Sequence, residues 1–132
     1  MREMEEMDDR IAAAIREQAR EGVMRCVTAF RIAKELNVTP LAVGETADAL
    51  EVRLTRCQLG LFGYGDQKSI VKPAEVVPPE LERAIEEGLV EGRLPCTVAW
   101  EIATRFGMPK LHVANAAEKL EIRIRPCQLG AF

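Results

Sequence analysis

The chain has 132 residues, 48% of them hydrophobic and 30% charged, with a net charge of −3 at pH 7. This is enough apolar material for a buried core, but no apolar run approaches the roughly 20 residues that span a bilayer. The acidic first nine residues lack the features of a signal peptide, so we expect a cytoplasmic protein that makes no membrane contact and keeps its four cysteines reduced.

The sequence contains one unit of about 50 residues twice, in tandem. Residues 14–62 align without a gap on residues 84–132, and 20 of the 49 pairs are identical. Such agreement indicates a duplicated supersecondary unit. We therefore predict an acidic tail over 1–9, a first repeat over 10–62, a linker over 63–77 and a second repeat over 78–132. Since a unit of about 50 residues is marginal alone, we expect the two copies to pack together pseudo-symmetrically.

The first element of each repeat is predicted to be an amphipathic helix. Apolar residues recur at a helical period over residues 11–23 and again over 81–90. The proline pair at 78–79, followed by acidic residues, predicts the start of the second of these helices. Gly22 and Gly92 are predicted to end them. Short and partly extended stretches follow at residues 23–25 and 93–95.

Two further helices follow in each copy, at residues 28–36 and 40–50 in the first and at 97–106 and 109–120 in the second. Asn37 and Gly107 accept the left-handed backbone that ends a helix. Thr39 is predicted to cap the next helix, with Pro40 at its first position.

After the third helix the apolar period changes from 3.6 to 2. Residues 52–55 and 122–125 alternate between apolar and polar, as a half-buried strand does. An isolated edge strand exposes backbone groups, so each needs a partner. The partner is either a preceding stretch of the same copy, such as Arg93–Leu94, or the strand of the other copy. Gly60, Gly63 and Gly65 then predict a flexible turn region. The repeated Cys-Gln-Leu-Gly-x-Phe run, which ends each copy, suggests no chemical mechanism.

The small and apolar residues of each helix pair follow a spacing that is shared by the two copies. They are Ala29, Ile32, Ala33, Val38, Val43, Ala47, Leu50 and Val52, matched by Ala99, Ile102, Ala103, Met108, Val113, Ala117, Leu120 and Ile122. This spacing resembles the helix-turn-helix core of winged-helix regulators over about 35 residues of each copy. The resemblance implies a mainly α fold of two tandem three-helix units, each with one or two short strands. It also implies DNA binding, as in a transcriptional regulator, although a full wing needs a hairpin and each copy offers one clear strand.

The resemblance places the third helix in the major groove of duplex DNA. The outward candidates in the second copy are Lys110, His112, Asn115 and Lys119, since Asn can read adenine and Lys can reach guanine or phosphate. In the first copy Glu45, Asp48 and Glu51 would repel phosphates. The candidates there are Thr39 and a backbone-contacting face of Arg31, Lys34 and Arg53.

A protein-interaction adaptor is the first alternative. Any basic face must be local, because the net charge is negative. For any single polar candidate, a solvated helix surface is a better explanation than a DNA contact. The partner is then another protein, including a second copy of the chain. Phe62, Tyr64 and Phe132 are candidates for an exposed aromatic patch, whereas Phe30 and Trp100 are expected to anchor the core.

Metal or redox sensing is the second alternative. Its candidates are Cys26, Cys57, Cys96 and Cys127, but no Cys-x-x-Cys occurs and His112 is the single histidine. Buried cysteines commonly act as small hydrophobes, so we expect no cofactor. The sequence also places no Ser–His–acid set, phosphate loop or paired carboxylates, and no enzymatic activity is expected.

Overall fold

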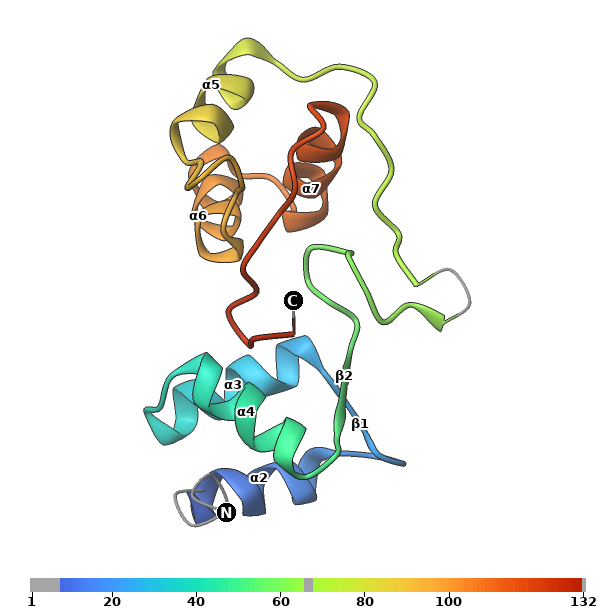
Figure 1. Ribbon diagram of the computed structural model, residues 1–132, viewed down its shortest axis with the longest axis vertical. Helices are drawn as coiled ribbons and strands as arrows, with labels where there is room; N and C mark the ends of the chain where they lie inside the picture. The colour runs from blue at the N-terminus through green and yellow to red at the C-terminus, as the bar shows by residue number, and fades with distance from the viewer. Residues whose placement is uncertain (1–7, 66–67, 132) are drawn as a thin grey trace. The chain divides into compact units, whose positions relative to one another are not determined.

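The computed structural model describes residues 8–65 and 68–131, and these are mainly helical, which confirms the predicted fold class at that level (Figure 1). The contacts divide the chain into two units. One runs up to Cys57 and also holds Leu129–Ala131, and the other is formed by Gln58–Gln128. None of the described helices has the length and apolar character that crossing a membrane requires.

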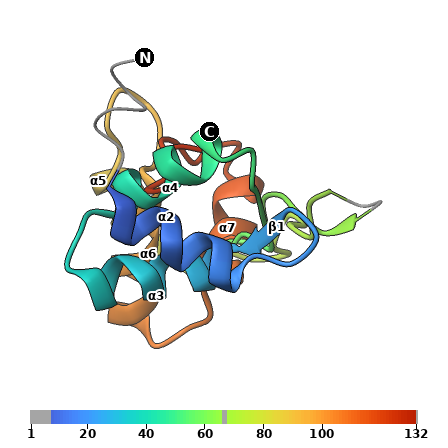
Figure 2. The same cartoon turned by 90° about the horizontal axis from the view of Figure 1, so that it is seen from below.

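The first unit is built from three helices and a pair of short strands. In chain order these are α2 (Asp9–Gln18), β1 (Val23–Arg25), α3 (Cys26–Leu36), α4 (Pro40–Ala49) and β2 (Arg53–Thr55). Helix α2 contacts both α3 and α4 (Figure 2). The core is made by the predicted apolar stripes, with Ile15, Ala29, Ile32, Val43 and Ala47 almost fully buried.

The second unit repeats the three helices as α5 (Pro79–Glu87), α6 (Cys96–Phe106) and α7 (Lys110–Lys119). Helix α5 begins at the predicted proline, with Glu80 and Glu82 in its first turn, where acids favour the positive end of the helix dipole. The corresponding core residues are Ile85, Ala99, Ile102, Val113 and Ala117.

Helix α2 begins inside the segment that was predicted as an acidic tail. The side chain of Asp8 accepts a hydrogen bond from the Arg10 backbone N–H at 2.8 Å, which makes Asp8 the N-cap. The Arg10 guanidinium also donates to this carboxylate, and this side-chain hydrogen bond lowers the pKa of Asp8. Residues 1–7 of the predicted tail lie outside the described part of the chain.

The predicted ends of the first helices at Gly22 and Gly92 are wrong. Helix α2 ends at Gln18 and α5 at Glu87. Both glycines instead occupy the second central position of a two-residue turn, after a glutamate that also has positive φ. Arg20 and Val23 close the first of these turns with two backbone hydrogen bonds of 2.9 and 3.0 Å. Such turns need positive φ at both central residues, so glycine here serves a turn and not a helix cap.

The strand after the third helix pairs within its own copy, which confirms the first of the two pairings considered. Strands β1 and β2 are parallel, with Met24 opposite Leu54. In the second copy the pairing shrinks to one parallel bridge between Leu94 and Ile124. The antiparallel hairpin of a full wing is therefore not what these residues form.

A three-residue bend joins the last two helices of each unit. Asn37 and Gly107 have the predicted left-handed backbone, with φ of 56° and 63°. The Val38 and Met108 N–H groups reach back to the carbonyls of Ala33 and Ala103 at 3.0 Å. These backbone bonds end α3 and α6 and set the direction of the next helix.

Thr39 is the N-cap of α4, as predicted, and its hydroxyl accepts from the Ala42 N–H at 3.1 Å. The Thr39→Ala variant is therefore expected to lower the free energy of unfolding by about 1 kcal/mol, measured by chemical denaturation. Thr104→Ala, on the exposed surface of α6, is the matched control and is expected to change stability by less than about 0.5 kcal/mol. Equal effects of the two substitutions would contradict the capping role.

The Leu-Gly end of the repeated Cys-Gln-Leu-Gly run packs in the unit formed by the helices of the other copy. Leu129 belongs to the first unit, and it is 2% exposed. A Cβ placed on Gly44 of α4 would overlap the carbonyl of Leu129. The backbone after the second copy's strand is thus packed directly on a helix of the first copy.

The first copy makes the reciprocal arrangement in the second unit. Leu59 is fully buried there, and a Cβ on Gly60 would lie 2.6 Å from Leu111 Cδ1 of α7. Gly130 has the same relation to Leu41 of α4, at 2.8 Å. Since Leu41 and Leu111 are equivalent positions of the repeat, each unit is completed by the segment that follows the other copy's strand. Gly60 lies in the turn region predicted there, and it is buried.

Candidate interaction surfaces

The outward face of α7, which was predicted to read DNA, is crossed by the linker. The Lys72 N–H donates to Oδ1 of Asn115 at 2.9 Å, and the Ala74 N–H donates to the Asn115 backbone carbonyl at 3.0 Å. Asn115 lies opposite the core residues Val113 and Ala117 on the helix, at the middle of the outward face. The amide oxygen expected to contact a base therefore already holds a segment of the same unit.

The linker presents itself to α7 as an extended chain. In an extended backbone the N–H groups of residues two apart point to the same side, so Lys72 and Ala74 can donate to one residue. Pro73 stands between them, where no donor is needed. Upstream, the Ile70 N–H donates to the Gly60 carbonyl at 2.8 Å, and the Ser69 hydroxyl donates to the same oxygen at 3.1 Å. The segment from Ser69 to Ala74 is thus anchored at both ends, a feature that its lack of periodicity did not indicate.

The other DNA-binding candidates on α7 lie in two different environments. His112 and Lys119 are exposed and share the outward side of the helix with Asn115. Lys110 is half-buried, and its Nζ lies 4.5 Å from the centroid of the Trp100 ring, within the range of a cation–π interaction.

The equivalent face of α4 carries different groups and is open. Leu41 is 46% exposed, and Glu45, Asp48 and Ala49 are all exposed. Glu45 occupies the position of Asn115, and Leu41 that of Leu111. This face therefore combines an exposed leucine with two carboxylates.

The remaining candidates of the first copy do not form one surface with α4. Arg31 and Lys34 are exposed on α3, and the Arg31 guanidinium donates to Gln18 Oε1 at 3.3 Å. Thr39 uses its hydroxyl to cap α4. Arg53 lies exposed on β2, where its register partner on β1 is Val23.

Arginines follow the outer side of both strand pairs. Arg25 and Arg53 are exposed in the first unit, whereas Met24, between them in register, is buried. In the second unit the side chains of Arg93, Arg123 and Arg125 are exposed around the buried Leu94–Ile124 bridge. These are the most basic surfaces that the strands offer, although exposed glutamates at 21, 51, 91 and 121 flank them.

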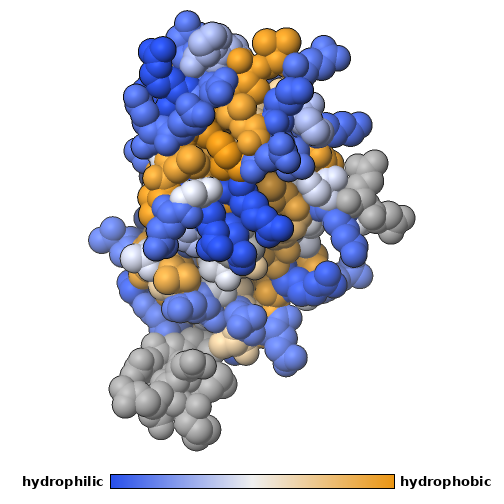
Figure 3. All heavy atoms as spheres, turned by 45° about the horizontal axis from the view of Figure 1, so that its top comes forward, coloured by the Kyte–Doolittle hydropathy of each residue, from blue (hydrophilic) through white to orange (hydrophobic). Residues whose placement is uncertain are grey.

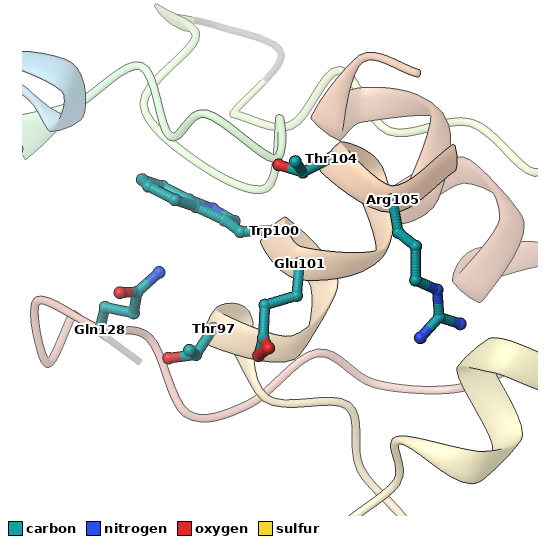
Figure 4. Close-up of a pocket in the computed structure, with 6 residues that line it drawn as sticks. All are labelled: Thr97, Trp100, Glu101, Thr104, Arg105 and Gln128. Carbon is teal, nitrogen blue, oxygen red and sulfur yellow. The ribbon is translucent and has the colours of Figure 1, made fainter. Parts of the chain in front are cut away.

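A shallow hollow lies on the side of α6. It is lined by Thr97, Trp100, Glu101, Thr104, Arg105 and Gln128. Figure 4 shows Trp100 and Gln128 on one side of it, with Arg105 projecting from α6 on the other. Trp100, which is expected to anchor the core, is half-buried and forms one wall of this hollow.

Apolar side chains also reach the surface of the second unit. Val76 and Val90 are 77% and 56% exposed. In the space-filling view, apolar groups of this unit gather within a rim of hydrophilic side chains (Figure 3). Phe62 and Tyr64 are half-buried and do not form the exposed aromatic patch that was considered, and Phe132 lies outside the described residues.

The four cysteines are buried, and no disulfide joins them. The Cys96 backbone N–H donates to the Pro126 carbonyl at 3.0 Å, and its Sγ lies 3.6 Å from the donating Gln128 Nε2. Within residues 8–65 and 68–131, no three or more His, Cys, Asp or Glu side chains are grouped in a way that could hold a metal ion. The contacts of Cys96 are those of a packed side chain beside the end of the strand pairing.

Comparison of the chain with protein-family models, with curated proteins and with solved structures gives no match.

Proposed function

We propose that this protein is a non-enzymatic interaction module that holds extended polypeptide on the outward face of the last helix of each unit. The observation that supports this function is the pair of hydrogen bonds from the Lys72 and Ala74 N–H groups to Asn115. They are backbone donors, so the face recognises an extended chain through groups that every polypeptide carries.

We interpret the pairs α3–α4 and α6–α7 as two helix-turn-helix units in tandem, adapted to protein partners. Each pair has a three-residue bend that begins with a left-handed residue, and each packs around a small alanine, Ala33 or Ala103. Alanine at this position lets two helices cross closely. Adaptation to protein is supported by charge, because Glu45 and Asp48 on α4 repel phosphate.

Duplex DNA is a second candidate partner. The observation that favours it is the set of exposed arginines on the strand pairs, together with the exposed His112 and Lys119 on α7. Arginines of this kind contact the phosphate backbone without reading sequence.

The Asn115→Ala variant tests the proposed function. Removal of Oδ1 is expected to speed hydrogen exchange at the Lys72 amide by about tenfold, because that N–H loses its acceptor. The Ala74 amide is expected to change less, since its acceptor is a backbone carbonyl. His112→Ala, an exposed change on the same helix, is the control and is expected to leave both rates unchanged.

A labelled duplex at low ionic strength provides the competing measurement. The proposed function predicts that the protein does not bind the duplex electrostatically. No duplex binding should be seen that weakens as salt is added and that also weakens in Lys110→Ala and Lys119→Ala. Binding that does fall in this way would establish the duplex as the ligand and overturn the proposal. Unchanged exchange at Lys72 in Asn115→Ala would remove its main support.

A further inference from the structure

We infer that the outward face of α4 is a vacant counterpart of the linker-bound face of α7, and that it binds an extended, positively charged peptide segment of a partner protein. This inference rests on the proposed function and assigns it a site and a class of ligand.

The two faces share their construction. Gly60 lies against Leu111 in the second unit, and Gly130 lies against Leu41 in the first, with the same leucine Cδ1 as the nearest atom in each case. Both glycines have positive φ, of 85° and 80°. We call the apolar surface around this leucine, where the glycine packs, the seat. The seat is therefore built in the same way on both helices.

What differs is the segment that covers the seat. In the second unit a Cβ on Gly60 would also lie 2.9 Å from Ile70 Cγ1, so the linker closes over this point. Leu111 is accordingly half-buried, whereas Leu41 is 46% exposed. An exposed leucine in a seat that is covered in the sister unit marks a site where an apolar side chain of a ligand can be buried.

The groups on α4 define the chemistry of the ligand. Glu45 stands where Asn115 stands, and its carboxylate is an acceptor for the same kind of backbone N–H. Asp48, three residues on, lies on the same side of the helix. The two charges favour lysine or arginine in the ligand and disfavour a nucleic acid.

The linker supplies the pattern that the ligand should follow. Ile70 meets the seat, and the donors to Asn115 come two and four residues later, at Lys72 and Ala74. A ligand for α4 therefore needs an apolar residue followed by N–H donors at the second and fourth positions after it. Proline is tolerated at the third position, as Pro73 shows.

The probe for this test is the peptide Lys-Ser-Ile-Val-Lys-Pro-Ala-Lys-Val, which is linker residues 68–76 with the change Glu75→Lys. It is added to the full chain, and backbone amide shifts are followed by NMR. The expected result is saturable shifts centred on Leu41, Glu45 and Ala49. A peptide that is N-methylated at the residue corresponding to Lys72 lacks one donor and is expected to bind about tenfold more weakly.

Variants of the protein separate the contributions to binding. Leu41→Ala is expected to weaken the peptide about tenfold through lost apolar contact. Glu45→Gln keeps an acceptor but loses its charge, and is expected to weaken binding about threefold at low salt and less at high salt. Glu35→Gln, an exposed acid on α3, is the matched control and is expected to leave affinity unchanged.

The alternative outcomes are distinguishable. Shifts centred on Asn115 and Lys72 would mean that the peptide displaces the linker from α7, which overturns this inference but leaves the proposed function standing. Absence of peptide binding together with salt-dependent duplex binding would overturn both. A dimer that forms without peptide and is lost in Leu41→Ala would identify a second copy as the occupant and overturn the assignment to a partner protein.

Discussion

The Leu129→Ala variant is expected to lower the stability of the first unit by about 2–5 kcal/mol, the range for a buried leucine cut back to alanine. Leu129 follows the strand of the second copy but belongs to the first unit, where it is 2% exposed. Hydrogen exchange should therefore accelerate most at Val43 and Ala47 of α4, in the other half of the sequence.

Leu59→Ala is the reciprocal control for this prediction. Leu59 is fully buried in the second unit, so its loss should accelerate exchange most at Val113 and Ala117 of α7. If each substitution instead affected the helices of its own copy, the exchange of segments described for the two units would be wrong.

The Gly44→Ala variant is expected to destabilise the protein by about 1–3 kcal/mol, as overpacking does. In an ordinary helix this substitution would stabilise by about 1 kcal/mol, because glycine is a poor helix former. Here the new Cβ would overlap the Leu129 carbonyl, and backbone cannot rotate away as a flexible side chain can. The sign of the change in unfolding free energy, measured by chemical denaturation, therefore decides between the two effects.

Ala49→Gly provides the comparison on the same helix. Ala49 is exposed and is the last residue of α4, so this substitution measures helix propensity without a packing contribution and should cost at most about 1 kcal/mol. A stabilising Gly44→Ala would show that Leu129 does not press on α4.

The local features that the sequence predicted correctly depend on neighbouring residues. The bend at Asn37, the cap at Thr39 and the start of α5 at Pro79 each follow from the conformations that one residue type permits. Gly22 was misassigned because glycine satisfies a helix end and a two-residue turn equally well. The backbone bonds between Arg20 and Val23, which decide between these roles, close a local antiparallel bridge that the residue type of Gly22 alone does not predict.

The candidate site was predicted only in part. The outward positions of α7, including Asn115, follow from helical periodicity, because the apolar stripe defines the opposite face. The ligand of Asn115 did not follow, since Lys72 is 43 residues away and extended segments with few apolar contacts leave no periodic pattern. A usable signal was present in the adjacent apolar pair Ile70 and Val71, which is unusual for a purely solvated linker.

The sequence by itself determined the duplication, the six described helices and most of the helical residues that form each core, because these depend on periodicity, on capping and on a shift of 70 positions. It did not place the buried Leu59 and Leu129 in a core, and Leu41, an apolar residue of α4, is 46% exposed. Only the tertiary structure decided which segments complete which unit. The apolar seats beside Leu41 and Leu111 are equivalent in both copies, so either Cys-Gln-Leu-Gly run satisfies the local chemistry of either seat. The choice is made by the path of the chain through the packed fold, and the same path covers the outward face of α7 while the corresponding leucine of α4 stays exposed.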